Sequence, residues 1–137
     1  MRGESKQRLE PRARKTFPRS GRLLKHADFE RVYKQGRRHF SASMTVFYWR
    51  RPEASPAAPG LRVGFTVGRA LGGAVQRNRI KRRMREAVRL TRVWPGAAAD
   101  VVINPKKVVL TADFETVLNE VRQAFMVIEK KLGGKAQ

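Results

Sequence analysis

The chain has few residues of the kinds that build covalent, metal or membrane-spanning sites. Its 137 residues include no cysteine, which excludes disulfides and thiolate metal ligands. The two histidines, His26 and His39, stand apart and match no zinc-binding pattern. No apolar run is long enough to cross a bilayer, and the N-terminus carries charges where a signal peptide would need its apolar segment. We therefore expect a cytoplasmic protein that binds no membrane, no metal and no small-molecule cofactor.

Acidic residues are also scarce. The chain has 11 Asp and Glu against 31 Lys and Arg, which gives a formal net charge of +20 and a pI near 11.7. Such an excess is typical of proteins that bind nucleic acids, and a membrane-surface role is the weaker alternative. The acids are scattered: Asp28 and Glu30 point apart on an expected helix, and Glu86 is isolated among arginines. No pair has the spacing of a two-metal hydrolytic site, so we predict no catalytic residue.

The densest positive charge lies in a segment without glycine or proline, residues 74–94. Between residues 77 and 92 there are eight Lys or Arg and one acid. Residues of small or apolar type recur at helical spacing, which predicts an amphipathic helix with one buried stripe: Ile80, Met84, Ala87, Val88 and Thr91. A solvated basic surface is the simplest interpretation of the other face. However, like charges four residues apart repel each other, and arginine suits bidentate contacts to phosphate, so the pattern favours nucleic-acid binding.

The rest of the chain predicts one domain, residues 21–132, between a basic arm at 1–20 that is disordered when free and a flexible tail at 133–137. A short helix is expected at 28–35 and two strands, or one bent strand, at 39–51. The proline-rich segment 52–60 is predicted to be a hairpin connection to a strand at 61–67. A short strand at 101–103 ends at Asn104 and Pro105, and Thr111 caps the last helix. The order α-β-β-β-α-β-α predicts a two-layer α/β (α+β) sandwich.

A glycine turn joins the predicted strand at 61–67 to the basic helix. Gly68, Gly72 and Gly73 precede the helix N-terminus, where backbone N–H groups can hold a phosphate. The spacing matches neither the dinucleotide fingerprint nor the P-loop. Turn geometry is therefore the preferred explanation, ahead of a dedicated nucleotide site.

Two segments together resemble the bacterial ribonuclease P protein subunit. They are Asp28-Phe29-Glu30-Arg31-Val32-Tyr33-Lys34-Gln35-Gly36, and Arg62-Val63-Gly64-Phe65-Thr66-Val67 followed by the glycine turn and the helix that contains Arg77-Asn78-Arg79. The resemblance spans about residues 22–130. It implies a left-handed β-α-β crossover through the basic helix, against the usual right-handed rule. The chain departs from the family at Gly68-Arg69-Ala70, where Ser-Lys-Lys is usual, so one cation is missing.

The resemblance also implies a function. Proteins of this family bind a large catalytic RNA, and the holoenzyme removes the 5′ leader of precursor tRNA with Mg²⁺ held mainly by the RNA. Eight residues match positions that face the catalytic RNA: Arg69, Arg77, Asn78, Arg79, Lys81, Arg82, Arg85 and Arg89. Three aromatic residues match the cleft that holds the leader: Phe29, Tyr33 and Phe47.

Other functions are compatible with the residues alone. Plain core packing is the alternative role for the three aromatic rings. A general RNA-binding module, an RNA chaperone or a ribosomal protein would share the basic composition and would bind unrelated structured RNAs equally well. A nuclease in its own right would need a cluster of carboxylates or histidines.

Overall fold

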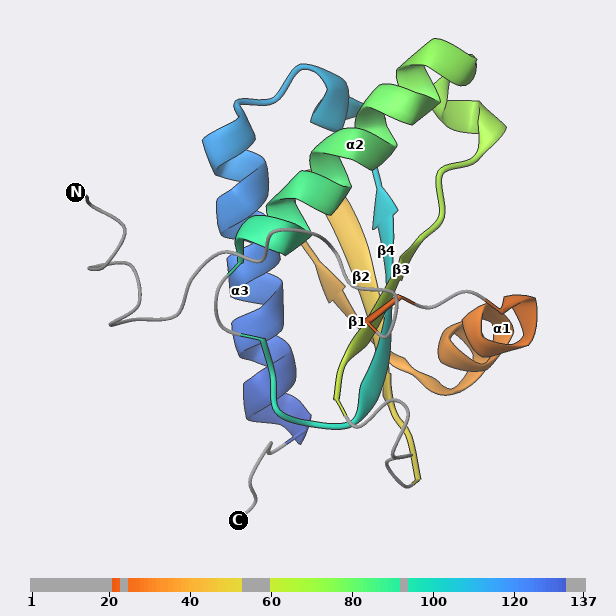
Figure 1. Cartoon of the computed structure of the whole chain (residues 1–137), viewed down its shortest axis with the longest axis vertical. Coiled ribbons are helices and arrows are strands. Elements are labelled where there is room, and N and C mark those ends of the chain that lie inside the picture. The colour runs from red at the N-terminus through yellow and green to blue at the C-terminus, as the bar shows by residue number, and fades with distance from the viewer. Residues whose placement is uncertain (1–20, 23–24, 53–59, 92–93, 133–137) are drawn as a thin grey trace, which may run out of the picture.

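A computed structural model describes residues 21–22, 25–52, 60–91 and 94–132, and Figure 1 shows how they fold. The predicted arm and tail lie outside the described residues. In the described part of the chain the predicted order of helices and strands is confirmed, and the short 3-10 helices η3 and η4 are added. The elements are α1 (His26–Gln35), β1 (Arg37–Phe40), β2 (Met44–Arg50), β3 (Arg62–Phe65), η3 (Arg69–Leu71), α2 (Ala74–Leu90), β4 (Ala99–Pro105), η4 (Lys107–Leu110) and α3 (Phe114–Leu132).

The four strands form one mixed sheet in the order β1-β2-β4-β3. β2 pairs antiparallel with both β1 and β4, and β3 pairs parallel with β4. The prediction of a hairpin connection at 52–60 was wrong, because β4 lies between β2 and β3. The predicted end of the fourth strand was also wrong. Asn104 and Pro105 pair with Thr45 and Met44 of β2, and a proline at a strand end removes little from the ladder.

The two faces of the sheet pack against different helices (Figure 1). On one face, the large core joins the sheet to α2 and α3 and includes Val46 and Tyr48 of β2. On the other face, Phe47 and Trp49 lie beside α1, whose Val32 is fully buried against Val102. Successive side chains of β2 therefore alternate between the two faces of the sheet. The main sandwich consists of the sheet with α2 and α3, and α1 covers part of the opposite face.

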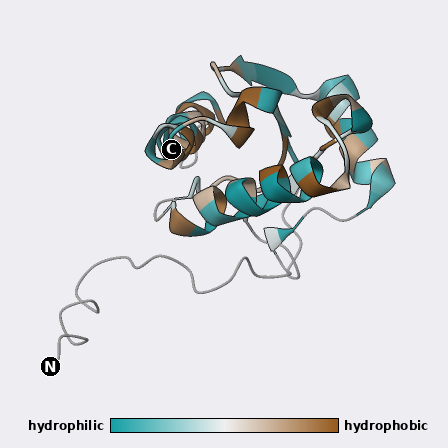
Figure 2. Cartoon of the chain, turned by 90° about the horizontal axis from the view of Figure 1, so that it is seen from above, coloured by the Kyte–Doolittle hydropathy of each residue, from teal (hydrophilic) through white to brown (hydrophobic). Residues whose placement is uncertain are grey.

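The basic helix is the connection between the parallel strands β3 and β4. Its predicted apolar stripe is confirmed, since all five of its residues are buried. The Gln76 side chain accepts a hydrogen bond from the Gly73 N–H at 3.1 Å and so satisfies one backbone donor at the helix start. Figure 2 shows hydrophobic and hydrophilic bands alternating along the helices, as one buried stripe per helix requires. This β-α-β unit is the one for which the resemblance implies a left-handed path.

The chain is closely packed where α1 ends, and a short 3-10 helix precedes the point where α3 begins. A Cβ atom on Gly36 would lie 2.5 Å from the Val32 carbonyl oxygen and 2.6 Å from that of Tyr48, so the chain leaves α1 where only glycine fits. The predicted cap of α3 was wrong. Thr111 ends η4, and Asp113 directly precedes α3, where its carbonyl oxygen accepts the N–H groups of Thr116 and Val117.

Candidate nucleic-acid interface

The outer face of α2 carries a row of cationic side chains that we call the α2 basic face. Asn78, Arg79, Arg82 and Arg85 are exposed, and Lys81 is half-buried. Within the described ranges, none of the four charged members forms an ion pair with an acid. Their charges repel one another along the helix surface, so a bound polyanion would relieve a cost that the folded chain alone retains.

The other predicted contacts to RNA lie at the two ends of this row. Arg77 donates from Nε to the Gly72 carbonyl oxygen at 3.2 Å, and Arg69 is exposed on η3 just before the helix. Arg89 forms an ion pair with Glu86, whose carboxyl pKa is lowered by the hydrogen bond from that guanidinium. All eight predicted residues therefore belong to α2 or to η3, but Arg89 has a partner inside the protein.

Arg83, which is not among the predicted contacts, has a different role. Its guanidinium donates to the Ala112 carbonyl oxygen and lies 5.7 Å from the centre of the Phe114 ring. The hydrogen bond and the cation–π contact therefore join α2 to the start of α3.

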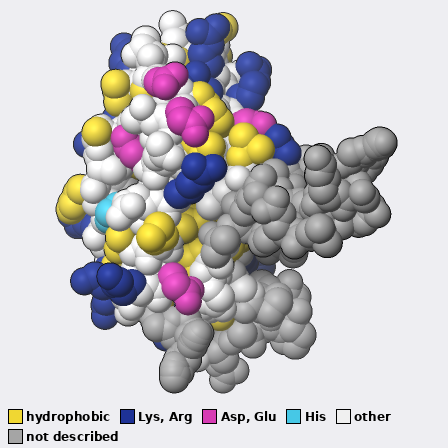
Figure 3. Space-filling view, turned by 90° about the vertical axis from the view of Figure 1, so that its left-hand side faces the viewer, with side chains coloured by type: hydrophobic (Ala, Val, Ile, Leu, Met, Phe, Trp, Pro, Cys, Tyr) yellow, Lys and Arg dark blue, Asp and Glu magenta, His cyan; other side chains and the backbone are white. Residues whose placement is uncertain are grey.

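The face that carries α3 differs from the α2 basic face. Four of the described acids lie on α3 or directly before it: Asp113, Glu115, Glu120 and Glu129. Figure 3, which looks onto the α3 side of the molecule, shows acidic, basic and apolar side chains mixed together. A surface of mixed sign attracts a polyanion less than a surface of one sign.

The three predicted aromatic residues come together between α1 and the sheet. Phe29 and Tyr33 of α1 join Phe47 and Trp49 of β2 over Val102, and we call these four rings the aromatic cluster. The Tyr33 and Phe47 rings meet edge to face with centroids 4.9 Å apart. Each of the four residues keeps some exposed surface. The cluster is thus part core and part surface, which neither alternative from the sequence had described.

Two cations border the aromatic cluster. The Arg38 guanidinium lies 5.4 Å from the centre of the Phe47 ring, and Arg31 lies 5.6 Å from that of Trp49. The Tyr33 hydroxyl donates to Asn104 Oδ1 at 3.0 Å and lies 2.6 Å from Thr66 Oγ1. Stacking surfaces, cations and hydrogen-bonding groups therefore occur side by side.

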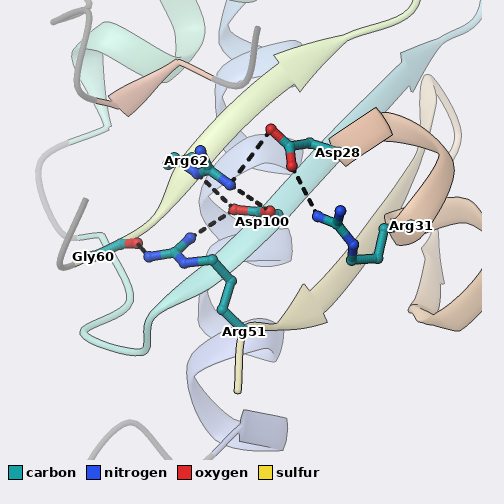
Figure 4. Close-up of polar contacts among 6 residues, drawn as sticks. All are labelled: Asp28, Arg31, Arg51, Gly60, Arg62 and Asp100. Carbon is teal, nitrogen blue, oxygen red and sulfur yellow. Dashed lines mark hydrogen bonds and ion pairs between the residues drawn. The ribbon is translucent and has the colours of Figure 1, made fainter. Parts of the chain in front are cut away.

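An ion network at the first turn of α1 was missed by sequence reasoning (Figure 4). Asp100, fully buried on β4, accepts hydrogen bonds from Arg51 at 2.6 Å and from Arg62 at 2.8 Å. Arg62 also lies 3.7 Å from Asp28, which holds Arg31 at 2.8 Å. The hydrogen bonds to Asp100 raise the pKa of Arg62. The one available signal was a single acid inside an apolar strand, since a buried charge requires a partner.

No set of three or more histidine or acidic side chains in the described part of the chain is arranged to hold a metal ion. Asp28 and Asp100 are bridged by Arg62, which forms an ion pair with each of them. Among the described residues, no helix is long and apolar enough to span a bilayer.

Comparison with known proteins identifies the family to which this chain belongs. A family model described as Ribonuclease P matches residues 17–129. The chain belongs to the ribonuclease P protein family. The ribonuclease P protein component of Symbiobacterium thermophilum is 37% identical over 106 residues, which cover 76% of this chain and 87% of that protein. That of Desulforapulum autotrophicum is 34% identical over 122 residues and is covered to 97%, with 86% of this chain.

Solved structures agree with the sequence comparison. The ribonuclease P protein from Thermotoga maritima superposes with a TM-score of 0.63 at 28% identity, and the match covers 76% of this chain and 94% of that one. As a member of the ribonuclease P protein family, the chain is an accessory subunit of a ribonucleoprotein endoribonuclease of tRNA processing.

Proposed function

We propose that the protein binds the catalytic RNA of ribonuclease P through the α2 basic face and the single-stranded 5′ leader of precursor tRNA on the aromatic cluster. One observation carries the proposal: the two surfaces lie on helices that cover opposite faces of the sheet. Both can therefore be occupied at once, as a subunit that links an RNA to its substrate requires.

The α2 basic face suits a folded RNA backbone. Guanidinium groups contact phosphate oxygens through paired N–H donors, and each contact releases counterions from the RNA. Four buried residues of α2, together with Thr91 at its C-cap, hold the helix that presents these cations. Binding should therefore be strong at low salt and should carry little sequence information.

The aromatic cluster suits an unpaired strand. Bases that are not stacked in a helix can stack on exposed aromatic rings, and nearby arginines neutralise the connecting phosphates. Mature tRNA lacks the leader, so this contact distinguishes substrate from product.

The metal ions of the reaction are proposed to be held mainly by the RNA. Mg²⁺ prefers oxygen ligands with negative charge. Here Asp28 and Asp100 accept hydrogen bonds from arginines, which satisfies their charge. The protein would assist metal binding indirectly by neutralising phosphate repulsion.

The first test concerns the α2 basic face. Replacing Arg79, Arg82 and Arg85 together by alanine should weaken binding of the catalytic RNA and reduce the slope of log K against log salt by roughly 0.7–0.9 for each phosphate that is no longer neutralised. The matched control removes three exposed cations of α3, Arg122, Lys130 and Lys131, and should change the slope little. An equal effect of both triple variants would reject α2 as the RNA site.

The second test concerns the aromatic cluster. Tyr33→Ala should weaken binding of precursor tRNA to the holoenzyme by about 1–3 kcal/mol while mature tRNA is little affected. Tyr33→Phe keeps the ring and should recover most of the affinity. Equal losses for precursor and mature tRNA would return the ring to a purely structural role.

A third test separates this proposal from its rivals. Purified protein with Mg²⁺ should leave precursor tRNA intact, and addition of the catalytic RNA should release the leader at one site. A general RNA-binding protein would instead bind unrelated structured RNAs with equal affinity. Site-specific cleavage by RNA-free protein would indicate a nuclease in its own right.

A further inference from the structure

The face of α1 that lies on the sheet has two buried residues of opposite character. Asp28 and Val32 are four positions apart, so they share one face of the helix. Val32 is fully buried and packs with Val102 of β4 in an apolar contact. Asp28, one turn earlier, is an acid. Apolar packing therefore holds the helix at Val32, whereas a carboxylate meets the sheet at the first turn.

The carboxylate of Asp28 meets the sheet at Arg62 of β3 (Figure 4). Arg62 Nη2 lies 3.7 Å from Asp28 Oδ2. The same guanidinium donates two hydrogen bonds of 2.8 Å to Asp100, whose side chain is fully buried. Two parallel N–H donors to one carboxylate fix the orientation of a guanidinium. Arg62 is therefore a fixed point of the sheet from which its charge can place the first turn of α1.

The contact between Asp28 and Arg62 is longer than the contact between Arg62 and Asp100, but water screens it little. The Arg62 and Asp28 side chains are only 22% and 12% exposed, and a partly buried pair is screened less than a surface pair. The other carboxylate oxygen of Asp28 accepts a hydrogen bond from Arg31 of α1 itself at 2.8 Å. Loss of the Asp28 charge would therefore release the first turn from the sheet while Val32 stays packed.

The first turn of α1 also carries Phe29, which follows Asp28 in the chain and belongs to the aromatic cluster. The two rings that α1 contributes to this cluster are held differently. Tyr33 has a hydroxyl that hydrogen-bonds to Thr66 and Asn104 of the sheet. Phe29 has no polar group, so the position of its ring depends on the turn that Asp28 holds.

We propose that Asp28 is a positioning residue for recognition of the leader: its ion pair with Arg62 sets the distance of the first turn of α1 from the sheet, and so the place of the Phe29 ring. This inference rests on the proposed binding of the leader by the aromatic cluster. Asp28 acts through Phe29 and not by touching the RNA, because its carboxylate is nearly buried and would repel a phosphate.

The test measures binding of precursor and mature tRNA to the reconstituted holoenzyme at a temperature where each variant is folded. Asp28→Asn keeps the shape of the side chain and removes its charge. It should weaken precursor tRNA by about three- to ten-fold and leave mature tRNA and the catalytic RNA unaffected. The matched control Asp113→Asn, at the exposed start of α3, should keep the wild-type ratio of the two affinities.

A second variant tests position separately from charge. Asp28→Glu keeps the charge but lengthens the side chain by one methylene, so it should lower the ratio by a smaller factor, and it decides the question if Asp28→Asn does not fold. A purely structural role would lower the thermal midpoint and leave the ratio unchanged. A wild-type ratio in both variants would therefore overturn the positioning role.

A double-mutant cycle with Phe29→Ala shows whether Asp28 acts through this ring. In the Phe29→Ala background, Asp28→Asn should weaken precursor tRNA little further, whereas independent and additive losses would overturn the inference. Phe29→Ala alone tests the proposed function. A selective loss of precursor tRNA keeps the leader on the aromatic cluster whatever the result at Asp28. Equal losses of precursor and mature tRNA would mean that the proposed function itself fails.

Discussion

The exposed arginines of the α2 basic face have no acidic partner among the described residues, whereas the arginines beside α1 are engaged by Asp28 and Asp100. Both regions use arginine, and they differ in whether an acidic side chain lies close enough to pair with it. A paired and buried arginine holds parts of the fold together and has little charge left for a ligand. An unpaired and exposed arginine contributes little to the fold and keeps its full charge for an RNA backbone.

The two proposed RNA surfaces differ in the same way. Contacts on the α2 basic face are ionic and should weaken steeply with salt. Contacts on the aromatic cluster would depend mainly on stacking, so they should depend less on salt and more on whether the RNA is single-stranded. A subunit with both surfaces can hold its RNA partner by charge and select its substrate by the leader.

The largest effect is expected from a change at Asp100, the acid that pairs with the arginines beside α1. Asp100→Asn removes the fully buried carboxylate that Arg51 and Arg62 share, and removal of one partner of a buried ion pair costs about 3–5 kcal/mol. Urea unfolding should show this decrease in stability. Arg82→Ala should show the opposite pattern, with unchanged stability and weaker RNA binding. An unaltered unfolding midpoint in Asp100→Asn would mean that this network is not what holds α1 and the sheet together.

A smaller effect is expected at the turn that follows α1. Gly36→Ala forces a Cβ against two carbonyl oxygens, and overpacking of this kind costs about 1–3 kcal/mol. The shift should displace α1, so leader binding should suffer more than binding of the catalytic RNA. Gly96→Ala is the control, because a Cβ there meets no atom within 4 Å. Equal stability of the two variants in thermal unfolding would contradict the tight turn.

The smallest effect is expected from a change at Glu86, the acid of α2 that pairs with Arg89. Glu86→Gln removes the one negative charge of the helix, which pairs with Arg89, so the catalytic RNA should bind about two-fold more tightly at low salt. Because the pKa of the Glu86 carboxyl is lowered, the pair is intact above the ordinary pKa of glutamate and is lost as pH falls through the lowered value. The difference between variant and wild type should vanish at that low pH and in high salt. Weaker binding by Glu86→Gln at neutral pH would show that the ion pair positions Arg89 for RNA.

The sequence predicted the elements whose signals are local. The stripe from Ile80 to Thr91 is buried as helical periodicity requires, and the alternation along β2 places Phe47 and Trp49 together. These features depend on residues a few positions apart, where periodicity is informative. The family resemblance added the gathering of Phe29, Tyr33 and Phe47, which periodicity alone would have assigned to core packing.

The features that sequence reasoning missed depend on distant residues. The position of β4 between β2 and β3 depends on pairing with both neighbours, and no local pattern near residues 52–60 records it. Asp100 meets Arg51 and Arg62 across three strands, so their partnership follows only from the sheet register. Asn104 looked like a strand terminator because asparagine disfavours strands, but pairing with Thr45 overrides that preference.

The central claim, that two surfaces contact two RNAs, can be tested directly because the chain has no cysteine. Single cysteines introduced as Arg82→Cys on α2, Thr66→Cys beside the aromatic cluster and Gln123→Cys on α3 would each carry a short photo-crosslinker in the holoenzyme with precursor tRNA. The probe on α2 should crosslink to the catalytic RNA, the probe at residue 66 to the leader, and the probe on α3 to neither. Crosslinking of the α2 probe to the leader, or of the residue 66 probe to the catalytic RNA alone, would contradict the assignment of the two surfaces.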